Sequence, residues 1–403
     1  MHDVVVSGMG AVTACGIGVE PLWQAAREGR SGVGPTTLTR WLGHKVRISA
    51  QVDRDAVSSR LTPQQIETTD PCSRFALVAA AEALAQSGLA PKDVAGRETA
   101  VVIGCSIGGI STLDDGYHAF YAEEASRVSP YTVPRIMANA PASQIGMAHG
   151  ITGPTLAIAT ACASGSQAIG LGMWLVRSGQ VRRAIVGGTD ANIAPGMLRA
   201  WEMTRALAPD ACRPFSQGRN GMVLGEGAGM LVIERGEDAR ARGVRPAARL
   251  AGYGTSGDAG DLLRPDPAGA AAALTAALDD AGLPPEAIGY IAAHGTGTVF
   301  NDIAETAAVR TVFGGHADGI AMSSTKPVTG HTLGAAGALN LLIAIRSLEE
   351  QFAPPTLNWL GADPQCDLDV VPNRGRAHAI QAVMANAFAF GGINAALVAA
   401  RAT

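Results

Sequence analysis

The stretch TACASGSQAIG, residues 160–170, sets a reactive cysteine, Cys162, between an apolar segment and a run of small residues typical of a helix start. A second stretch, GHTLGAAGALNLLIAIRSLEE at residues 330–350, repeats this order with His331 as the reactive side chain. Similar supersecondary units in one chain indicate an internal duplication. Aligning the two stretches places Cys162 opposite His331.

A further pair of segments supports the duplication. AEALAQSGLAPKDV at residues 81–94 is similar to TAALDDAGLPPEAI at residues 275–288. Each pattern predicts an amphipathic helix ended by Gly-Leu and a proline-containing turn, which is a common way for a helix to stop. We therefore predict two similar units, residues 1–245 and residues 246–403. The alternative is that alanine-rich helices resemble one another by composition alone.

Apolar segments alternate with alanine- and leucine-rich stretches along the chain. The apolar segments lack a polar face, as strands in the centre of a sheet do. They predict strands at residues 4–10, 100–106, 155–161, 183–189, 229–235, 288–295, 319–326 and 382–392. This alternation predicts an α/β fold with helices covering both faces of a sheet.

The composition excludes several classes of protein. Hydrophobic residues make up 47% of the 403 residues and charged residues 16%, which indicates a folded chain rather than a disordered one. The net charge of -4 and the lack of a basic stripe give no reason to expect nucleic acid as a partner. No uninterrupted apolar stretch reaches the length of about 18 residues that a membrane span needs, so we expect none.

The N-terminus and the cysteines favour a cytoplasmic location. The opening MHDVVVSGMGAV lacks the charged start and apolar core of a signal peptide. The six cysteines lie far apart and form no CxxC pair, so the spacing indicates neither a disulfide scaffold nor a zinc site. Free thiols fit a reducing compartment.

Cys162 could be an inert core residue, as most isolated cysteines in apolar surroundings are. Its position between a strand and a helix favours a nucleophile, because a helix N-terminus stabilises a thiolate. The small residues at 163–166 leave room for a substrate. On such a tight turn the backbone N–H of Cys162 would also lie near a developing oxyanion.

Two of the eight histidines lie in glycine-rich segments that follow apolar strands. They are His294 in AAHGTGT and His331 in TGHTLGAAG. A single histidine in such a place is often structural. Two of them, together with a cysteine at a helix start, form a candidate catalytic set. No HxxxH spacing supports a metal site, so we expect no metal.

Five segments, taken in order, resemble one known family. They are TACASG around Cys162, RPFSQGRNGMVLGEGAGMLVIE at 213–234, HGTGTVFND at 294–302, SSTKPVTGHTLGAAG at 323–337 and NAFAFGGIN at 386–394. Together they resemble the β-ketoacyl-[acyl-carrier-protein] synthases of the elongating, FabF-like (KAS II) branch. RPDPAGAAAAL and DPQCDLDVVPN add a similarity to nodulation-type ketosynthases. The resemblance covers the whole chain and implies a thiolase-like fold, with duplicated βαβαβαββ halves in a five-layer αβαβα sandwich.

The resemblance also implies the reaction, a decarboxylative Claisen condensation that lengthens an acyl chain by two carbons. Cys162 matches the family's nucleophile, which accepts the acyl group. His294 and His331 match the two histidines that bind the thioester carbonyl of malonyl-carrier protein. Lys326 and Glu305 match a lysine and a buried acid that support the site, although the two could form only a structural ion pair.

Other matched positions would contact the substrate. Phe390 matches a gating aromatic residue whose backbone N–H contributes to the oxyanion hole. Thr296 and Thr298 match threonines that contact the pantetheine arm. Ile107 and Trp201 fall where relatives line the acyl pocket, although Trp201 could instead belong to the core or to a dimer interface.

The resemblance implies that the substrates arrive on the phosphopantetheine of an acyl carrier protein and that no cofactor is needed. Carrier proteins are acidic, so we expect a basic patch at the entrance of the site. Arg127 and Arg205 are the candidates, and each could equally be a solvated surface arginine.

The resemblance further implies a dimer, either of two identical chains or with a non-catalytic, chain-length-factor-like subunit. Such subunits lack the nucleophile, so Cys162 disfavours that role for this chain itself. Housekeeping fatty-acid elongation and specialised or polyketide chain extension both stay open. A thiolase is disfavoured, because thiolases have a cysteine near the C-terminus and the last cysteine here, Cys366, precedes NAFAFGG.

Overall fold

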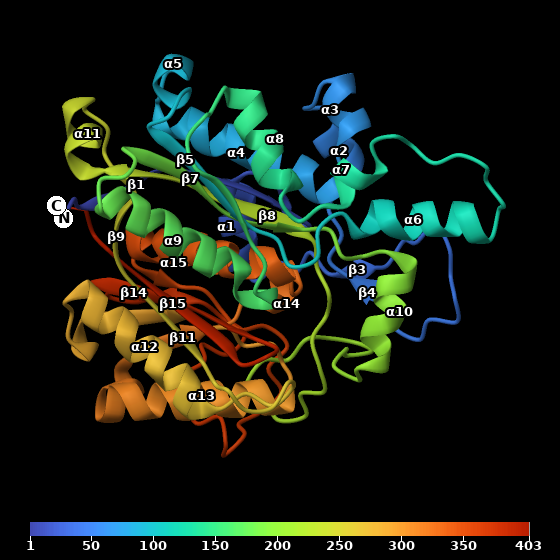
Figure 1. Cartoon of the computed structure of the whole chain (residues 1–403). Coiled ribbons are helices and arrows are strands. Elements are labelled where there is room, and N and C mark those ends of the chain that lie inside the picture. Colours follow the sequence, from blue (N-terminus) through green and yellow to red (C-terminus); the bar gives the residue numbers. More distant parts are fainter. Residues whose placement is uncertain (403) are drawn as a thin grey trace.

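The computed structural model describes residues 1–402, and two sets of five strands form its framework (Figure 1). The first set consists of β1 (Val4–Thr13), β5 (Thr99–Gly104), β6 (Thr155–Ile158), β7 (Arg183–Asp190) and β8 (Gly227–Arg235). The second set consists of β9 (Ala248–Gly257), β10 (Ile288–Ala292), β11 (Ala321–Ser323), β14 (Ala382–Ala389) and β15 (Ile393–Ala400).

Both sets have the same topology. The first runs β6-β5-β7-β8-β1 and the second β11-β10-β14-β15-β9, so the third strand of each set lies at an outer edge. In each set the three strands at that edge are parallel and the remaining pairings are antiparallel. A short ladder between β1 and β9 joins the sets. This arrangement confirms the predicted thiolase-like α/β fold, whereas a domain boundary after residue 245 remains a prediction.

Helices form three layers around and between the strands. α4 and α8 pack on the outer face of the first set, α12 and α13 cover the second, and α9 and α15 lie between the two (Figure 1). Their bounds are α4 (Pro71–Ser87), α8 (Ala140–His149), α9 (Ser164–Arg177), α12 (Pro267–Ala281), α13 (Val299–Phe313) and α15 (Ala336–Glu350). The result is the five-layer αβαβα order.

No helix in residues 1–402 is long and apolar enough to cross a lipid bilayer.

Shorter elements connect the layers, and α6 stands out to one side in Figure 1. These elements are β2 (Gly16–Ile17), α1 (Val19–Glu28), β3 (Gly34–Pro35), β4 (Ile48–Ser49), α2 (Arg54–Ser58), α3 (Pro63–Thr68), α5 (Pro91–Val94), α6 (Ile110–Tyr121), α7 (Thr132–Ile136), η1 (Ala161–Ala163), α10 (Pro195–Met203), α11 (Gly236–Ala241), η2 (Pro285–Ala287), η3 (Gly314–Gly319), α14 (Lys326–Thr329), η4 (Leu333–Ala335), β12 (Phe352–Ala353) and β13 (Arg376–Ala377).

The two central helices begin in the same way. Ala161 and Leu333 both have a left-handed backbone with φ of 48°. Each starts a 3-10 turn, η1 or η4, that leads directly into α9 or α15. The counterpart of Cys162 is therefore Gly334, and the alignment of Cys162 with His331 is wrong. Glycine-rich stretches can be aligned in several registers, and the backbone conformation selects this one.

The starts of α9 and α15 touch each other closely. A Cβ on Gly165 would lie 2.7 Å from the carbonyl oxygen of Gly334, and one on Gly337 would lie 2.1 Å from Oγ of Ser166. Both distances are too short for a side chain, so glycine is required at these positions. This contact brings the turn that carries Cys162 against the turn that follows His331.

Candidate active site

Cys162 lies in η1, between β6 and α9, and is 6% exposed. Ala161 before it has the left-handed backbone, which is strained for a residue with a side chain. Ser164 stabilises the turn, because its hydroxyl donates to the carbonyl of Ala161 at 2.6 Å and accepts from the N–H of Thr160 at 2.9 Å. These bonds hold the thiol at the start of α9.

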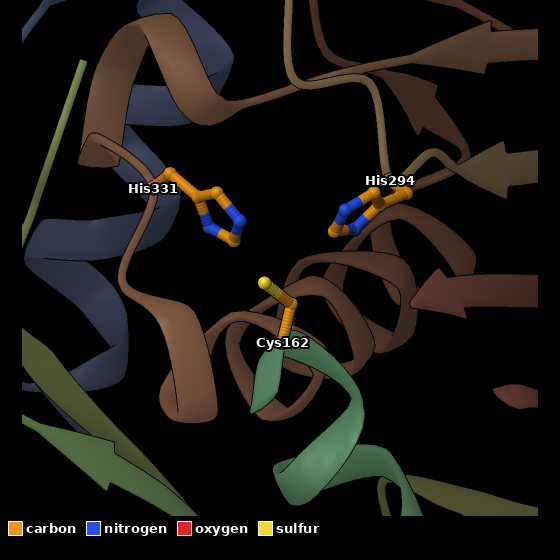
Figure 2. A group of neighbouring side chains, drawn as sticks. All are labelled: Cys162, His294 and His331. Carbon is orange, nitrogen blue, oxygen red and sulfur yellow. The ribbon is translucent and has the colours of Figure 1, made fainter. Parts of the chain in front are cut away.

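His294 and His331 approach this thiol from the second set of strands. His294 follows β10 and is 2% exposed, and His331 follows α14 and is 1% exposed. The ring centroids lie 5.4 Å apart, with the ring planes at 81°. One nitrogen of each ring and Sγ of Cys162 all lie within 4.8 Å of one another. Figure 2 shows both rings beside the sulfur, so the structure brings the three predicted residues together.

Glu305 and Lys326 hold the backbone on which His294 stands. Glu305, on α13, accepts from the N–H of His294 at 2.8 Å, the N–H of Gly295 at 2.7 Å and the side-chain amide of Asn386 at 3.0 Å. The ammonium of Lys326 donates to the carbonyl of His294. Both side chains are buried, and no ion pair within residues 1–402 joins them. The contacts fix the position of the imidazole.

Burial sets the protonation of the site. Burial raises the pKa of the Cys162 thiol to about 12, and the positive charge of Lys326 only partly opposes this. Burial also lowers the pKa of His294 and of His331 well below the ordinary value, with Lys326 adding to the effect. The thiol and both imidazoles are therefore neutral at rest.

A narrow cavity of about 50 Å³ lies between the thiol and the surface. It is lined by residues of both sets of strands, including seven of the predicted ones: Cys162, Trp201, His294, Thr296, Thr298, His331 and Phe390. The hydroxyls of Thr296 and Thr298 lie 2.8 Å apart. Apolar lining dominates, as expected for a channel that takes an acyl chain or a pantetheine arm.

Two aromatic rings stack across this cavity. Trp201 on α10 and Phe390 after β14 have centroids 6.0 Å apart and planes inclined by 30°. Trp201 also packs against a small cluster of buried apolar residues. Trp201 therefore belongs both to this cluster and to the wall of the cavity. Phe390 lies at the mouth of the cavity and is 38% exposed.

Five predicted residues lie outside the cavity lining. Two of them, Glu305 and Lys326, contact the backbone of His294, and the other three are Ile107, Arg127 and Arg205. Ile107 is 38% exposed and is not among the residues that line the cavity. Arg127 is exposed in the segment after α6, and Arg205 is exposed beside Ala206, which does line the cavity. Of the two arginines, Arg205 is the one that the structure places next to the mouth.

The structure also adds residues that the sequence patterns did not single out. Asn301 and Arg264 line the cavity, and the guanidinium of Arg264 lies 5.0 Å from the ring centroid of Phe300. Leu262 and Leu263 line it too and are more than half exposed. Arg264 begins RPDPAGAAAAL and Asn301 lies in HGTGTVFND, but neither similarity carries information on a cavity, and Leu262 and Leu263 lie in no quoted segment.

A metal ion is a weaker use of the same three side chains. Neutral imidazoles suit a metal, but a thiol must lose its proton to bind one, and the pKa of Cys162 is raised. The arrangement fits acyl transfer better, because it combines a nucleophile with two hydrogen-bonding imidazoles.

Comparisons with known proteins agree with this geometry. The β-ketoacyl synthase N-terminal domain matches residues 1–239, and the β-ketoacyl synthase C-terminal domain matches residues 247–359. Nodulation protein E of a Rhizobium species is 40% identical over 394 residues, 98% of each chain. The 3-oxoacyl-[acyl-carrier-protein] synthase 2 of a Synechocystis species is 37% identical over 402 residues, 98% of this chain and 97% of the relative.

Solved structures are similar over the full length of both chains. The ishigamide ketosynthase/chain length factor superposes with a TM-score of 0.96 at 34% identity, covering 100% of each chain. A type II polyketide-synthase acyl-carrier protein in complex with its ketosynthase bound to the hexaketide gives 0.92 at 30% identity, again with 100% coverage of each chain.

Proposed function

Because this chain belongs to the β-ketoacyl synthase family, we propose a role for each residue of its site in one condensation. The reaction is the decarboxylative Claisen condensation of malonyl-carrier protein with an enzyme-bound acyl chain, in fatty-acid or type II polyketide biosynthesis. The protein is therefore an acyltransferase. The observation that carries the residue roles is a neutral, buried Cys162 thiol beside two neutral imidazoles.

In the first half-reaction the sulfur of Cys162 attacks the thioester carbonyl of an acyl chain on phosphopantetheine. A carbon–sulfur bond to Cys162 forms, and the bond to the pantetheine sulfur breaks. Because the thiol is neutral at rest, its proton leaves during the attack, and either neutral imidazole can relay it to the departing sulfur. The covalent intermediate divides one difficult condensation into two easier steps.

In the second half-reaction His294 and His331 donate hydrogen bonds to the thioester carbonyl of malonyl-carrier protein. When carbon dioxide leaves, its bonding electrons pass into an enolate, and these donors stabilise the negative oxygen. The N–H of Leu333 donates to Nδ1 of His331 at 3.3 Å, which assigns the ring proton to Nε2. A neutral ring with this tautomer is a donor at Nε2.

The enolate carbon then attacks the acyl carbonyl on Cys162. The carbon–sulfur bond breaks, the sulfur takes up a proton from solvent water, and the product is a 3-oxoacyl chain two carbons longer. The backbone N–H groups of Cys162 and Phe390 would stabilise the tetrahedral oxyanion, at about 3 kcal/mol for each donor. Glu305 and Lys326 keep His294 in place through its backbone.

The substrates bring their own carrier, so we propose no cofactor. Thr296 and Thr298 would contact the amides of the pantetheine arm, since their hydroxyls line the channel. Trp201 and Ile107 would border the acyl chain. Specialised chains of the nodulation type are the proposed substrates, supported by the similarity to nodulation protein E.

We propose an acyl carrier protein as the partner that delivers the substrates, with Arg127 and Arg205 as its basic contacts. Arg205 has the stronger support, because its neighbour Ala206 lines the cavity. A reducing cytoplasm is the proposed compartment, and the six cysteines of the described chain are all free.

We also propose that the protein works as a dimer, with a second copy or with a chain-length-factor-like subunit. α6 exposes Tyr117, Phe120 and Tyr121 by 58%, 52% and 75%. Large apolar side chains gathered on a surface often mark an interface. The similarity to the ishigamide ketosynthase/chain length factor supports the heterodimer as the second candidate.

Intact-protein mass spectrometry tests the proposal. The protein is incubated with saturated and polyenoyl carrier-protein thioesters of several lengths, followed by malonyl-carrier protein. We expect a mass gain of one acyl group that is absent from Cys162→Ala, and release of a 3-oxoacyl product. A mass gain that persists in Cys162→Ala would refute the assigned nucleophile. No gain until a second subunit is added would favour the heterodimer.

A further inference from the structure

A carboxylate from the first set of strands binds the turn behind His331. Asp190, the last residue of β7, is fully buried. Its carboxylate accepts from the N–H of Gly334 at 2.5 Å, the hydroxyl of Ser106 at 2.6 Å and the N–H of Ser106 at 3.2 Å. The thiol of Cys105 donates to its other oxygen at 3.4 Å. Asp190 therefore ties the ends of β5 and β7 to η4.

The equivalence of the two halves shows that this carboxylate occupies the place that the oxyanion would take in the first half. Gly334 is the counterpart of Cys162, so its N–H corresponds to the N–H that we assign to the oxyanion hole. In the second half that position is filled by Asp190, a negatively charged oxygen of the protein itself. A Cβ on Gly334 would lie 2.5 Å from the carboxylate and 2.8 Å from the N–H nitrogen of Ser106, so no side chain fits there.

The same turn sets the orientation of the His331 ring. Leu333, with its strained left-handed backbone, donates its N–H to Nδ1 of the ring. The backbone of His331 is held separately, because its N–H donates to Val223 at 2.7 Å and its carbonyl accepts from Gly225 at 3.0 Å. The backbone of His331 thus does not depend on η4, whereas the direction and tautomer of its ring do.

We propose that Asp190 is a positioning residue for the second half-reaction. Its carboxylate fixes Gly334, which keeps Leu333 in the conformation that donates to Nδ1 and so leaves Nε2–H of His331 as the donor to the substrate. This inference rests on the proposed function of His331 and adds a residue that touches neither the substrate nor the imidazole.

A rival explanation is that Asp190 acts through its charge. Its negative charge is one of the causes that raise the pKa of Cys162, after burial. Asp190→Asn separates the two explanations, because the amide oxygen can still accept from Gly334 while the charge is gone. Asp190→Ala removes both the acceptor and the charge.

The experiment measures the two half-reactions of the full-length protein separately. In Asp190→Ala we expect kcat for condensation with malonyl-carrier protein to fall about 100-fold. KM and the rate of Cys162 acylation should change by no more than about twofold. Asp190→Asn should restore condensation to within about threefold of the unchanged protein. Asp280→Asn, which removes a surface partner of Arg177, is the matched control.

Nitrogen-15 NMR of histidine-labelled protein gives a readout that a loss of stability alone would not change. The Nδ1 and Nε2 signals of His331 should show one tautomer in the unchanged protein and in Asp190→Asn, and a mixture in Asp190→Ala. If Asp190→Ala does not fold, Ser106→Ala removes the hydroxyl that donates to the carboxylate, loosens the same turn and should slow condensation alone.

Three results would overturn the inference. They are an equal fall of acylation and condensation, equal activities of Asp190→Asn and Asp190→Ala, and an unchanged tautomer in an impaired variant. Failure of the proposed function is distinct, since it would appear as absent acylation of the unchanged protein.

Discussion

The thiol of Cys162 is protonated at rest, because burial raises its pKa to about 12. The thiol lies at a helix start, where a thiolate is stabilised, but burial disfavours the charged form and raises the pKa of the thiol. A resting thiol is protected from adventitious oxidation and alkylation, because the thiolate is the reactive species.

This protonation state predicts the pH dependence of alkylation. Because the pKa of Cys162 is raised to about 12, the thiolate fraction at any pH below that value increases about tenfold for each unit by which the pH rises. The rate of iodoacetamide labelling should therefore rise continuously between about pH 7 and pH 9.5, without a plateau. Mass spectrometry of the Cys162 peptide measures the rate, with Cys162→Ala as the blank. A plateau below about pH 9 would contradict the neutral resting thiol.

The sequence motifs singled out three side chains that the structure brings together, but they did not predict the surroundings of these side chains. Cys162, His294 and His331 stand in recognisable segments, and the structure brings them within 4.8 Å of one another. The direction of the Cys162 pKa depends on burial by residues distant in the sequence, which no local pattern contains. Asp190 was missed for the same reason, since its partner Gly334 lies in the other half of the chain.

The sequence patterns did not predict two of the strands, β9 and β15. β9 contains Gly252 and Gly254, which weaken any strand pattern. They are needed because α12 lies so close that a Cβ on Gly254 would be 2.1 Å from the carbonyl oxygen of Ala273. β15, with the sequence INAALVAA, is rich in alanine and resembles a helix by composition. Tertiary contacts override the local preference in both strands.

The contact between β9 and α12 predicts a sharp difference between two glycines of one strand. Gly254→Ala should lower the free energy of unfolding by about 3 kcal/mol, because its Cβ would meet backbone atoms that cannot move independently. Gly257→Ala is the control, since nothing lies within 4 Å of its Cβ position. Urea unfolding followed by circular dichroism measures both. Equal midpoints for the two variants would mean that β9 and α12 can separate at little cost.

For the whole molecule, the repeated pattern predicted the duplication, and the structure confirms the thiolase-like fold while correcting the register between the halves. The repeated strand order is visible only in space, because β1 and β9 lie beside each other although they are far apart in the chain. A composition rich in alanine and glycine supports several alignments. The left-handed residues at Ala161 and Leu333 remove that ambiguity.

The proposed dimer predicts a surface variant with an effect on assembly alone. Phe120→Asp combined with Tyr121→Asp places two charges on the exposed face of α6 and should weaken dimerisation by about 100-fold, because a buried charge without a partner is costly. Sedimentation velocity at several concentrations measures the change. Leu360→Asp, at a 69% exposed position outside α6, is the control and should leave assembly unchanged. An unaltered dimer in the double variant would remove α6 from the interface.

The interlocked starts of α9 and α15 have a consequence for how the molecule moves. The backbones of Gly165 and Gly334 are in direct contact, so the two halves are packed together at this point without room for a hinge between them. If one half moved away from the other, Cys162 would first have to separate from His294 and His331. Admission of a substrate therefore requires movement elsewhere, at the rim that Leu262, Leu263 and Phe390 form, while the starts of α9 and α15 stay together.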